Sequence, residues 1–134
     1  MIGNGGVPLG KAAAIGIAGL ALLSFGAAAA RADTAAERGE TLFAQCAACH
    51  SLEADTTIVG PSLHELFGRK AASIDSFTYS NAFSGADFVW DKAHLAQLLR
   101  DPAAMFPGTK MLTPGLKNPA EIADLIAYLE GATR

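Results

Sequence analysis

The sequence has few residues of the kinds that bind structural metal ions or form disulfides. Its 134 residues include only two cysteines, Cys46 and Cys49, and three histidines. A closed tetrahedral zinc site would need two more ligands, and neither His64 nor His94 lies at zinc-finger spacing from the cysteine pair. A disulfide across two intervening residues would close a very small, strained loop. The cysteine pair is therefore unlike a zinc site or a structural disulfide.

The sequence also lacks strand-like alternation ahead of Cys46 and lacks an excess of basic residues. A thioredoxin-like dithiol needs a βαβ setting, which the missing alternation disfavours. The whole chain has 10 basic and 13 acidic residues. Without Lys11 and Arg31, residues 33–134 have 8 basic and 13 acidic residues and a formal charge of −5. An acidic surface argues against nucleic acid or anionic lipid as a partner.

The sequence does contain Cys46-Ala47-Ala48-Cys49-His50, which is the Cys-x-x-Cys-His attachment pattern of c-type haem. Two thiols at this spacing, at the end of a helix, can reach the two vinyl groups on one edge of a porphyrin and form thioethers. The next residue, His50, then lies under the ring and can give its imidazole to the iron. The motif predicts one haem c, covalently bound through Cys46 and Cys49.

The first 32 residues have the pattern of a secretory signal peptide. Residues 12–30 are apolar and rich in small residues, and Ala30-Arg31-Ala32 is an Ala-x-Ala cleavage site. We expect cleavage after Ala32, which leaves residues 33–134 as the haem domain. The alternative is that residues 12–30 are retained as a membrane anchor, since 19 residues can just span a bilayer. Their low hydrophobicity and the cleavage site favour removal.

Apolar spacing and capping residues predict three main helices in residues 33–134. The first covers residues 34–48 and places Gly39, Phe43 and Ala47 on one face. The second follows Asp91 as its N-cap and ends or bends at Pro102. The third has Asn118 as N-cap, Pro119 at its first position and Glu121 as half of a capping box. The expected apolar stripes of the last two helices are Leu95, Leu98 and Leu99, and Ile122, Leu125, Ile126 and Leu129.

The rest of the domain is expected to be loop. The sequence predicts a short helical turn at residues 63–67. It predicts a loop at residues 77–81, with a short helix after it. Residues 105–115 contain two prolines and two glycines, which predict a constrained loop. About a hundred residues with this much loop supply a thin core. A buried porphyrin would add the missing apolar mass, so folding should depend on the cofactor.

From Cys46 to its end, the chain resembles class I cytochromes c of the mitochondrial type. The matching stretches, in chain order, are CAACHS, GPSLHELFGRK, FTYSNA, PGTKM and DLIAYL. They follow the family's order at near-family spacing. The resemblance implies an all-α fold, the class I cytochrome c fold, with about four to five helices and long loops around one haem.

The resemblance also implies roles for individual residues. Met111, in Pro-Gly-Thr-Lys-Met, would be the second axial ligand, opposite His50. The Pro61 carbonyl would accept a hydrogen bond from the other ring nitrogen of His50. The residues that would bind the haem propionates are Arg69, Tyr79, Trp90 and Thr109. A His/Met pair raises the reduction potential, and two filled axial positions leave no site for oxygen or peroxide.

The function implied by the resemblance is that of a periplasmic electron carrier and not of an enzyme. The carrier would be a monomer that passes one electron between membrane or periplasmic redox proteins of a respiratory or photosynthetic chain. The donor would be a protein such as a cytochrome bc-type complex, and the acceptor one such as a terminal oxidase or reductase. Two alternatives stay open. One is a carrier anchored to the inner membrane, and the other is the haem subunit of an oxidoreductase with peroxidase-like side activity.

The chain departs from the family pattern at several positions. One residue is missing between Phe43 and Cys46, so the end of the first helix should be reshaped. Leu98 stands where the family usually has a tyrosine, and Phe83 where it usually has an asparagine. Ala103 and Ala104 stand where the family has two lysines that it uses to dock on acidic partners. Of the basic residues around the haem edge, only Lys110 remains. We therefore expect docking through a small apolar patch made from Ala47, Ala48, Ala103, Ala104 and Met105 or Phe106.

Overall fold

The structure is a computed structural model that describes residues 33–134 together with Gly3, Gly5, Gly6 and Gly10. The segment expected to be a signal peptide or an anchor, residues 12–30, lies outside the described residues. The chain divides into one unit of residues 1–30 and a second of residues 31–134, and the described domain belongs to the second. Within the described part of the chain, no helix is long and apolar enough to cross a membrane.

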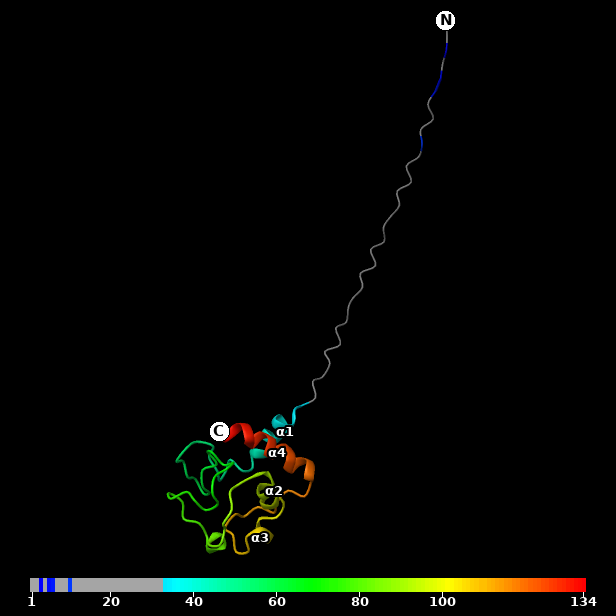
Figure 1. The fold of residues 1–134 in the computed structure, drawn as a ribbon. Helices are drawn as coiled ribbons and strands as arrows, with labels where there is room; N and C mark the ends of the chain where they lie inside the picture. The colour runs from blue at the N-terminus through cyan, green and yellow to red at the C-terminus, as the bar shows by residue number, and fades with distance from the viewer. Residues whose placement is uncertain (1–2, 4, 7–9, 11–32) are drawn as a thin grey trace. The chain divides into compact units, whose positions relative to one another are not determined.

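Four α-helices and one 3₁₀ helix form the described domain, and long loops join them (Figure 1). In chain order these elements are α1 (Ala35–Phe43), η1 (Asn81–Phe83), α2 (Lys92–Arg100), α3 (Pro102–Met105) and α4 (Pro119–Ala132). Across residues 33–134 the only β-type pairings are two isolated bridges, His50 with Thr57 and Lys70 with Val89. The all-α prediction is confirmed.

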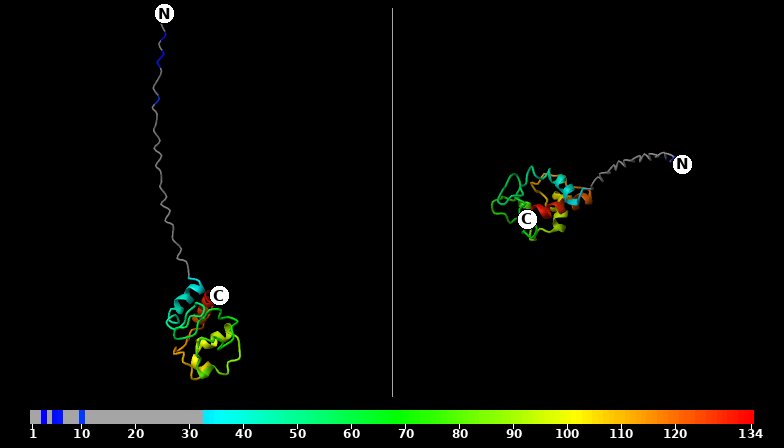
Figure 2. Two further views of the ribbon diagram at one scale, coloured as in Figure 1. Left: turned by 90° about the vertical axis from the view of Figure 1, so that its left-hand side faces the viewer. Right: turned by 90° about the horizontal axis from the view of Figure 1, so that it is seen from above.

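The first and last helices pack closely against each other, and Figures 1 and 2 show α1 beside α4 at one end of the domain. Gly39 makes this approach possible, because a Cβ on Gly39 would lie 2.7 Å from the Cβ of Tyr128 and closer still to the Asp124 carbonyl oxygen. The Phe43 and Tyr128 rings meet one turn further along, with centroids 5.4 Å apart. Arg38 joins the same two helices through two hydrogen bonds to Asp124, of 2.7 and 2.8 Å.

The second helix begins as predicted. Asp91 is the N-cap of α2, and its side chain accepts a hydrogen bond of 2.8 Å from the His94 amide. The three leucines of the predicted stripe are buried. The helix ends at Arg100, because Pro102 cannot continue its hydrogen bonding. The chain then forms α3, a four-residue helix with Asp101 as N-cap and Pro102 at its start, which was not predicted.

The last helix also matches its sequence signals. Asn118 caps α4 by accepting a hydrogen bond of 2.9 Å from the Ala120 amide, and Pro119 occupies the first helical position. The capping-box contact expected of Glu121 is not among the hydrogen bonds of the described residues. All four residues of the predicted apolar stripe are buried, with Leu125 only 1% exposed. This stripe and the α2 leucines supply most of the core.

Two local predictions were wrong. The first helix ends at Phe43 and not at residue 48, and residues 44–49 form turns. The Phe43 carbonyl accepts from the Cys46 amide, three residues on, at 2.8 Å as well as from the Ala47 amide at 3.0 Å, so the regular helical hydrogen-bond pattern is interrupted. Ala47 is consequently exposed and does not share the buried face of Gly39 and Phe43. Residues 63–67 form turns and no helix, with Glu65 at a φ of 50°.

Candidate haem site

The cysteine motif lies in the turns that follow α1. The amides of Cys49 and His50 both bond to the Cys46 carbonyl, at 3.0 and 2.9 Å. Both cysteines are free and half-buried. Burial raises the pKa of the Cys46 thiol, and the nearby Cys49 thiol raises it further by a smaller amount. A thioether forms when S–H adds across a vinyl C=C bond, and two thiols in one turn can supply this chemistry.

The His50 ring is fixed on one side by the loop of residues 57–61. Its Nδ1 lies 2.8 Å from the Pro61 carbonyl oxygen. Because a carbonyl can only accept, Nδ1 carries the proton and Nε2 keeps a lone pair available for a metal. Gly60 lies directly under the ring, where a Cβ would come within 2.8 Å of Nδ1 and 2.9 Å of Nε2. The importance of Gly60 was not recognised from the sequence.

Backbone bonds hold this loop against the cysteine motif. The Cys49 carbonyl accepts hydrogen bonds from the amides of Val59, at 3.2 Å, and Gly60, at 2.7 Å. Thr57 forms the isolated bridge with His50. The orientation of the His50 ring therefore depends on main-chain contacts and not on a flexible side chain.

Met111 lies in the Pro-Gly-Thr-Lys-Met loop, far along the chain from His50. Gly108 adopts a φ of 85°, and the Thr109 amide bonds to the Phe106 carbonyl at 2.9 Å. The Thr109 hydroxyl then accepts a hydrogen bond of 3.2 Å from the Met111 amide. Met111 is half-buried against the core, whereas its neighbour Leu112 is 96% exposed. The loop directs two adjacent side chains to different environments.

The residues expected to bind propionates are only partly connected to one another. Arg69 donates to the carbonyls of His64, at 2.5 Å, and Ser62, at 3.0 Å. Burial lowers the pKa of Arg69, and the nearby Tyr79 acts against this lowering. Arg69 and Trp90 are neighbours through a backbone bond of 2.8 Å, and Trp90 is 7% exposed. In the described part of the chain, no hydrogen bond joins Thr109 to these three residues.

Ser80 is a further polar residue that sequence reasoning missed. Its hydroxyl is buried and has no hydrogen-bond partner within the described chain. It directly follows Tyr79, whose own hydroxyl accepts a hydrogen bond of 3.4 Å from the Ile74 amide. A buried hydroxyl without a partner costs free energy, and a carboxylate of a bound group would remove that cost. The available signal was a serine inside the Phe-Thr-Tyr-Ser-Asn-Ala stretch.

An aromatic cluster occupies the region between η1, α2 and α3. Phe83 stacks on Phe106 with ring centroids 4.0 Å apart, and it also contacts Tyr79 at 5.6 Å. Phe88 meets Trp90 edge-on at 5.0 Å. Phe106 is 6% exposed, so it belongs to the core and not to the apolar surface patch for which it was considered. The four alanines of that expected patch are exposed, and Met105 is half-buried.

The described residues also form a cleft. It has a volume of about 810 Å³ and is lined by residues that include Ser62, His64, Glu65, Arg69 and Arg134. Neither His50 nor Met111 contributes to it. The site is therefore identified by its donor atoms and not by the size of a cavity.

The residues present fit a covalently bound haem. The two cysteine thiols lie in one turn, next to an imidazole whose Nδ1 is hydrogen-bonded to a backbone carbonyl. The Met111 thioether lies in a loop that contains two prolines and two glycines. The buried Ser80 hydroxyl has no hydrogen-bond partner within the described residues. The thiols match the attachment chemistry of haem c, and imidazole and thioether are both known axial ligands of haem iron.

Comparison with known proteins gives relatives of one kind. The family model described as cytochrome c matches residues 36–133. The chain is 41% identical over 113 residues to cytochrome c2 of Blastochloris viridis, an alignment that covers 84% of this chain and 88% of the relative. It is 46% identical over 88 residues to cytochrome c2 iso-2 of Magnetospirillum fulvum, covering 66% and 92%.

A solved structure gives the same result. Cytochrome cH from Methylobacterium extorquens superposes with a TM-score of 0.66 at 41% sequence identity. The match covers 72% of this chain and 97% of the solved chain.

Proposed function

Because this chain belongs to the cytochrome c family, as a class I electron carrier with one haem c bound through Cys46 and Cys49, we propose that His50 and Met111 are its two axial ligands. When bound, haem c supplies a one-electron Fe(III)/Fe(II) couple. The observation that carries the proposal is the distance of 2.8 Å between His50 Nδ1 and the Pro61 carbonyl oxygen. This contact leaves Nε2 free to bind a metal and raises its basicity.

We propose that the Met111 sulfur would be the sixth ligand of the haem iron, in addition to His50. A thioether is a soft, neutral ligand, and a His/Met pair raises the reduction potential. The Thr109 hydroxyl supports the Met111 amide, and Gly108 shapes the turn that precedes it. A loop held in this way keeps the sulfur in similar positions in both redox states. With both axial positions filled, we propose that the protein carries electrons and does not bind or reduce peroxide.

Five residues are proposed to hold the propionates. Four were expected from the sequence, and the fifth is Ser80, whose buried hydroxyl has no partner among the described residues. The set is Arg69, Tyr79, Trp90, Thr109 and Ser80. Arg69 supplies a permanent positive charge, because burial lowers its pKa without removing its proton at neutral pH. The others supply hydroxyl or indole donors.

The proposed cellular setting is the periplasm. Residues 1–32 would be a signal peptide that is cleaved after Ala32, and residues 33–134 would be the haem domain. The carrier would work as a monomer between a donor such as a cytochrome bc-type complex and an acceptor such as a terminal oxidase or reductase. Intact mass of the exported holoprotein tests the cleavage, since retained residues 1–32 would add their full mass.

The ferric absorption spectrum of the purified holoprotein tests the ligand set. A low-spin spectrum with the weak red-edge band of methionine–iron ligation is expected. A high-spin spectrum would instead indicate an open sixth position and would favour the alternative of a peroxidase-like haem subunit. Cyanide binding provides a second measurement, because an open position binds cyanide quickly and a methionine-filled one binds it slowly.

A further inference from the structure

Phe83 is a half-buried aromatic side chain to which the proposed function gives no role. It ends η1, at one of the positions where the chain departs from the family pattern. Its ring stacks on the Phe106 ring, with centroids 4.0 Å apart and ring planes 22° apart. Phe106 is 6% exposed and lies five residues before Met111. The stack therefore joins η1 to the residue that leads into the Pro-Gly-Thr-Lys-Met loop.

Hydrogen bonds anchor Phe106 and connect it to Met111. The Phe106 amide bonds to the Pro102 carbonyl at 2.9 Å, at the end of α3. The Phe106 carbonyl accepts from the Thr109 amide, also at 2.9 Å. The Thr109 hydroxyl in turn accepts from the Met111 amide at 3.2 Å. A displacement of Phe106 would therefore reach the main chain of Met111 through Thr109.

The Phe83 end of the stack is held by its own element. The Phe83 amide bonds to the Ser80 carbonyl at 3.0 Å, and the Phe83 carbonyl accepts from the Ala86 amide at 3.0 Å. The Phe83 ring also contacts the Tyr79 ring, with centroids 5.6 Å apart. Phe106 thus packs against a ring whose main chain is fixed by residues far from the methionine in the sequence.

The loop that carries Met111 has little regular structure to fix its place. Residues 106–118 contain no helix and no strand. Side-chain packing must then decide how precisely the loop is placed, and aromatic pairs contribute more than the apolar area that they bury. A ligand has to be held within roughly 0.5 Å of its productive position. The stack is the contact through which η1 can supply that precision.

We propose that Phe83 is a positioning residue for the sixth ligand of the haem iron. By stacking on Phe106, it holds the Pro-Gly-Thr-Lys-Met loop in the one arrangement that keeps the Met111 sulfur at the metal. The inference rests on the proposed function, since it takes Met111 to be that ligand. Phe83 offers no donor atom, so its effect is on how often the sulfur leaves and not on what replaces it.

Cyanide binding to the ferric holoprotein measures how often the sulfur leaves. The cyanide carbon donates its lone pair to Fe(III) as the Met111 sulfur departs with its own lone pair, and no electron is transferred. Phe83→Leu removes the ring but keeps an apolar side chain, and it should raise the cyanide rate by roughly two- to tenfold. The weak red-edge band should also disappear at a lower temperature. Phe83→Tyr keeps the ring and should retain the parent's rate.

Phe77→Leu is the matched control. Phe77 is also half-buried and also contacts the Tyr79 ring, edge-on at 4.8 Å. In the described part of the chain, no aromatic contact joins Phe77 to Phe106. This variant should leave the cyanide rate unchanged even if it lowers the thermal midpoint. Equal acceleration by Phe77→Leu and Phe83→Leu would mean that the whole cluster acts through general stability, and it would overturn the proposal.

A double-mutant cycle tests whether the effect passes through the stack. Once Phe106→Leu has removed one ring, Phe83→Leu should add little to the cyanide rate, because the two residues act as a pair. Fully independent effects of the two substitutions would contradict this. Denaturant unfolding followed by circular dichroism is measured on the same variants. A Phe83→Leu protein that loses stability but keeps the parent's cyanide rate and red-edge band would show that Phe83 only fills space.

The same samples separate this inference from the proposed function. If the parent protein lacks a low-spin, methionine-ligated ferric spectrum, or if Met111→Ala retains that spectrum, the ligand assignment fails and the inference fails with it. If the parent has the spectrum, Met111→Ala loses it and Phe83→Leu behaves as the parent does, only the role of Phe83 is wrong.

Discussion

The contact between Gly60 and the His50 ring is the tightest constraint on a single residue in the site. Glycine is required here because of space and not because of backbone conformation, since Gly60 has no positive φ. Any added Cβ has to move either the imidazole or the loop that carries the Pro61 carbonyl. The consequence reaches the proposed iron ligand directly, although Gly60 itself has no chemical group to offer.

Gly60→Ala is therefore expected to weaken the proposed ligation. Overpacking of this kind costs about 1–3 kcal/mol, and here it should also break the hydrogen bond between His50 and Pro61. The measurements are the thermal midpoint of the holoprotein and the fraction of purified protein that carries haem. Gly85→Ala is the control, because a Cβ at Gly85 meets nothing within 4 Å. Identical behaviour of the two variants would show that the ring has room.

Met111→Ala is expected to open the sixth position. Alanine has no donor atom, so the variant should bind cyanide faster than the parent and gain weak peroxidase activity. Met105→Ala is the control, because Met105 ends α3 outside the Pro-Gly-Thr-Lys-Met loop. The ferric spectrum and the cyanide rate are the measurements. A Met111→Ala protein with the parent's spectrum and cyanide rate would mean that another residue is the ligand.

Individual site residues differed in how well the sequence revealed them. The cysteine motif was the clearest signal, because the histidine that follows the Cys-x-x-Cys spacing favours haem attachment over a redox dithiol or a zinc site. The part played by Gly60 was hidden, because a steric contact between residues 50 and 60 has no sequence pattern. Ser80 was hidden for a similar reason, since an unpartnered hydroxyl becomes visible only once its burial is known.

At the scale of elements, the contact between α1 and α4 depends on the missing side chain of Gly39. In an exposed helix, replacing glycine by alanine stabilises by roughly 0.5–1 kcal/mol, because it restricts the unfolded chain. At Gly39 the added Cβ would meet the Asp124 carbonyl and the Tyr128 Cβ. Gly39→Ala should therefore lower the free energy of unfolding by about 1–3 kcal/mol.

The matched control for this prediction lies in the partner helix. Gly131 is inside α4, and a Cβ there would meet nothing within 4 Å. Gly131→Ala should stabilise the protein, whereas Gly39→Ala should destabilise it, so the two substitutions differ in sign. Denaturant unfolding of the holoprotein measures both. Stabilisation by Gly39→Ala would mean that the helices separate easily and that their close approach is unimportant.

Helix starts were predicted better than helix ends. Asp91 and Asn118 act locally on the first turn of their helices, so a short stretch of sequence is sufficient to identify them. The end of α1 depends instead on the motif that follows it, where Cys46 and Ala47 share the Phe43 carbonyl. The short α3 was missed because Pro102 both ends one helix and begins the next.

At the scale of the whole molecule, the apolar core is small for the amount of loop. Twelve buried apolar side chains support a described domain of about a hundred residues, and residues 44–80 contain no helix. A ligand that binds only the folded state stabilises that state, and a covalent ligand cannot be lost by dilution. The haem should therefore be needed for folding as well as for electron transfer.

The double substitution Cys46→Ser/Cys49→Ser is expected to abolish folding and not only colour. Far-UV circular dichroism should show little helix and no cooperative thermal transition. Cys46→Ser alone is the control, because Cys49 and His50 remain to hold the haem, and it should stay folded with a lower midpoint. A haem-free double variant with native helicity and a cooperative transition would contradict the prediction.

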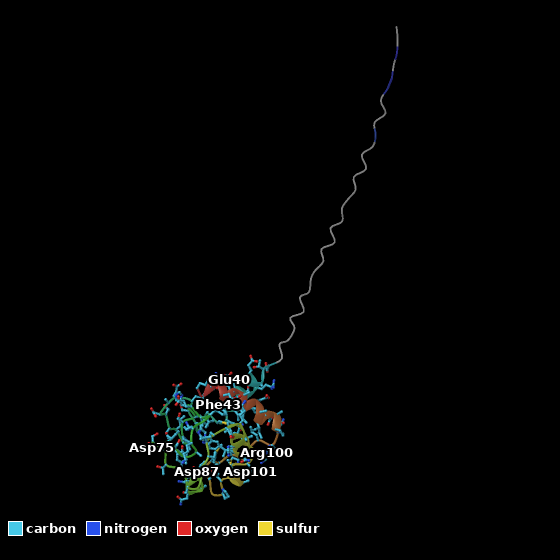
Figure 3. All side chains as sticks on the ribbon, in the orientation of Figure 1. Glu40, Phe43, Asp75, Asp87, Arg100 and Asp101 are labelled. Atoms are coloured by element: carbon cyan, nitrogen blue, oxygen red, sulfur yellow. The ribbon has the colours of Figure 1, made fainter. Side chains whose placement is uncertain are left out.

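Charge is the other property of the whole molecule, and it bears on how partners find this carrier. Residues 33–134 have a formal charge of −5, and the exposed acids are widely distributed, with Glu40, Asp75 and Asp87 at the outside of the domain (Figure 3). A local basic face could still act if Lys92, Lys110 and Lys117 were free. However, Lys92 is paired with Glu130 at 2.8 Å, so only Lys110 and Lys117 of these three remain against the net negative charge.

Steering by charge should accordingly be weak or reversed. The measurement is the second-order rate of electron transfer with the physiological partner as salt is raised, over the range in which the Debye length falls from roughly 30 to 8 Å. If opposite charges attracted the partner, added salt would screen that attraction and lower the rate about tenfold over that range. Such a fall would indicate that a local basic face guides the approach. Contact through apolar surface is insensitive to salt, and screening of the acidic surface can only help an acidic partner approach. The expected result is therefore a flat or slightly rising rate.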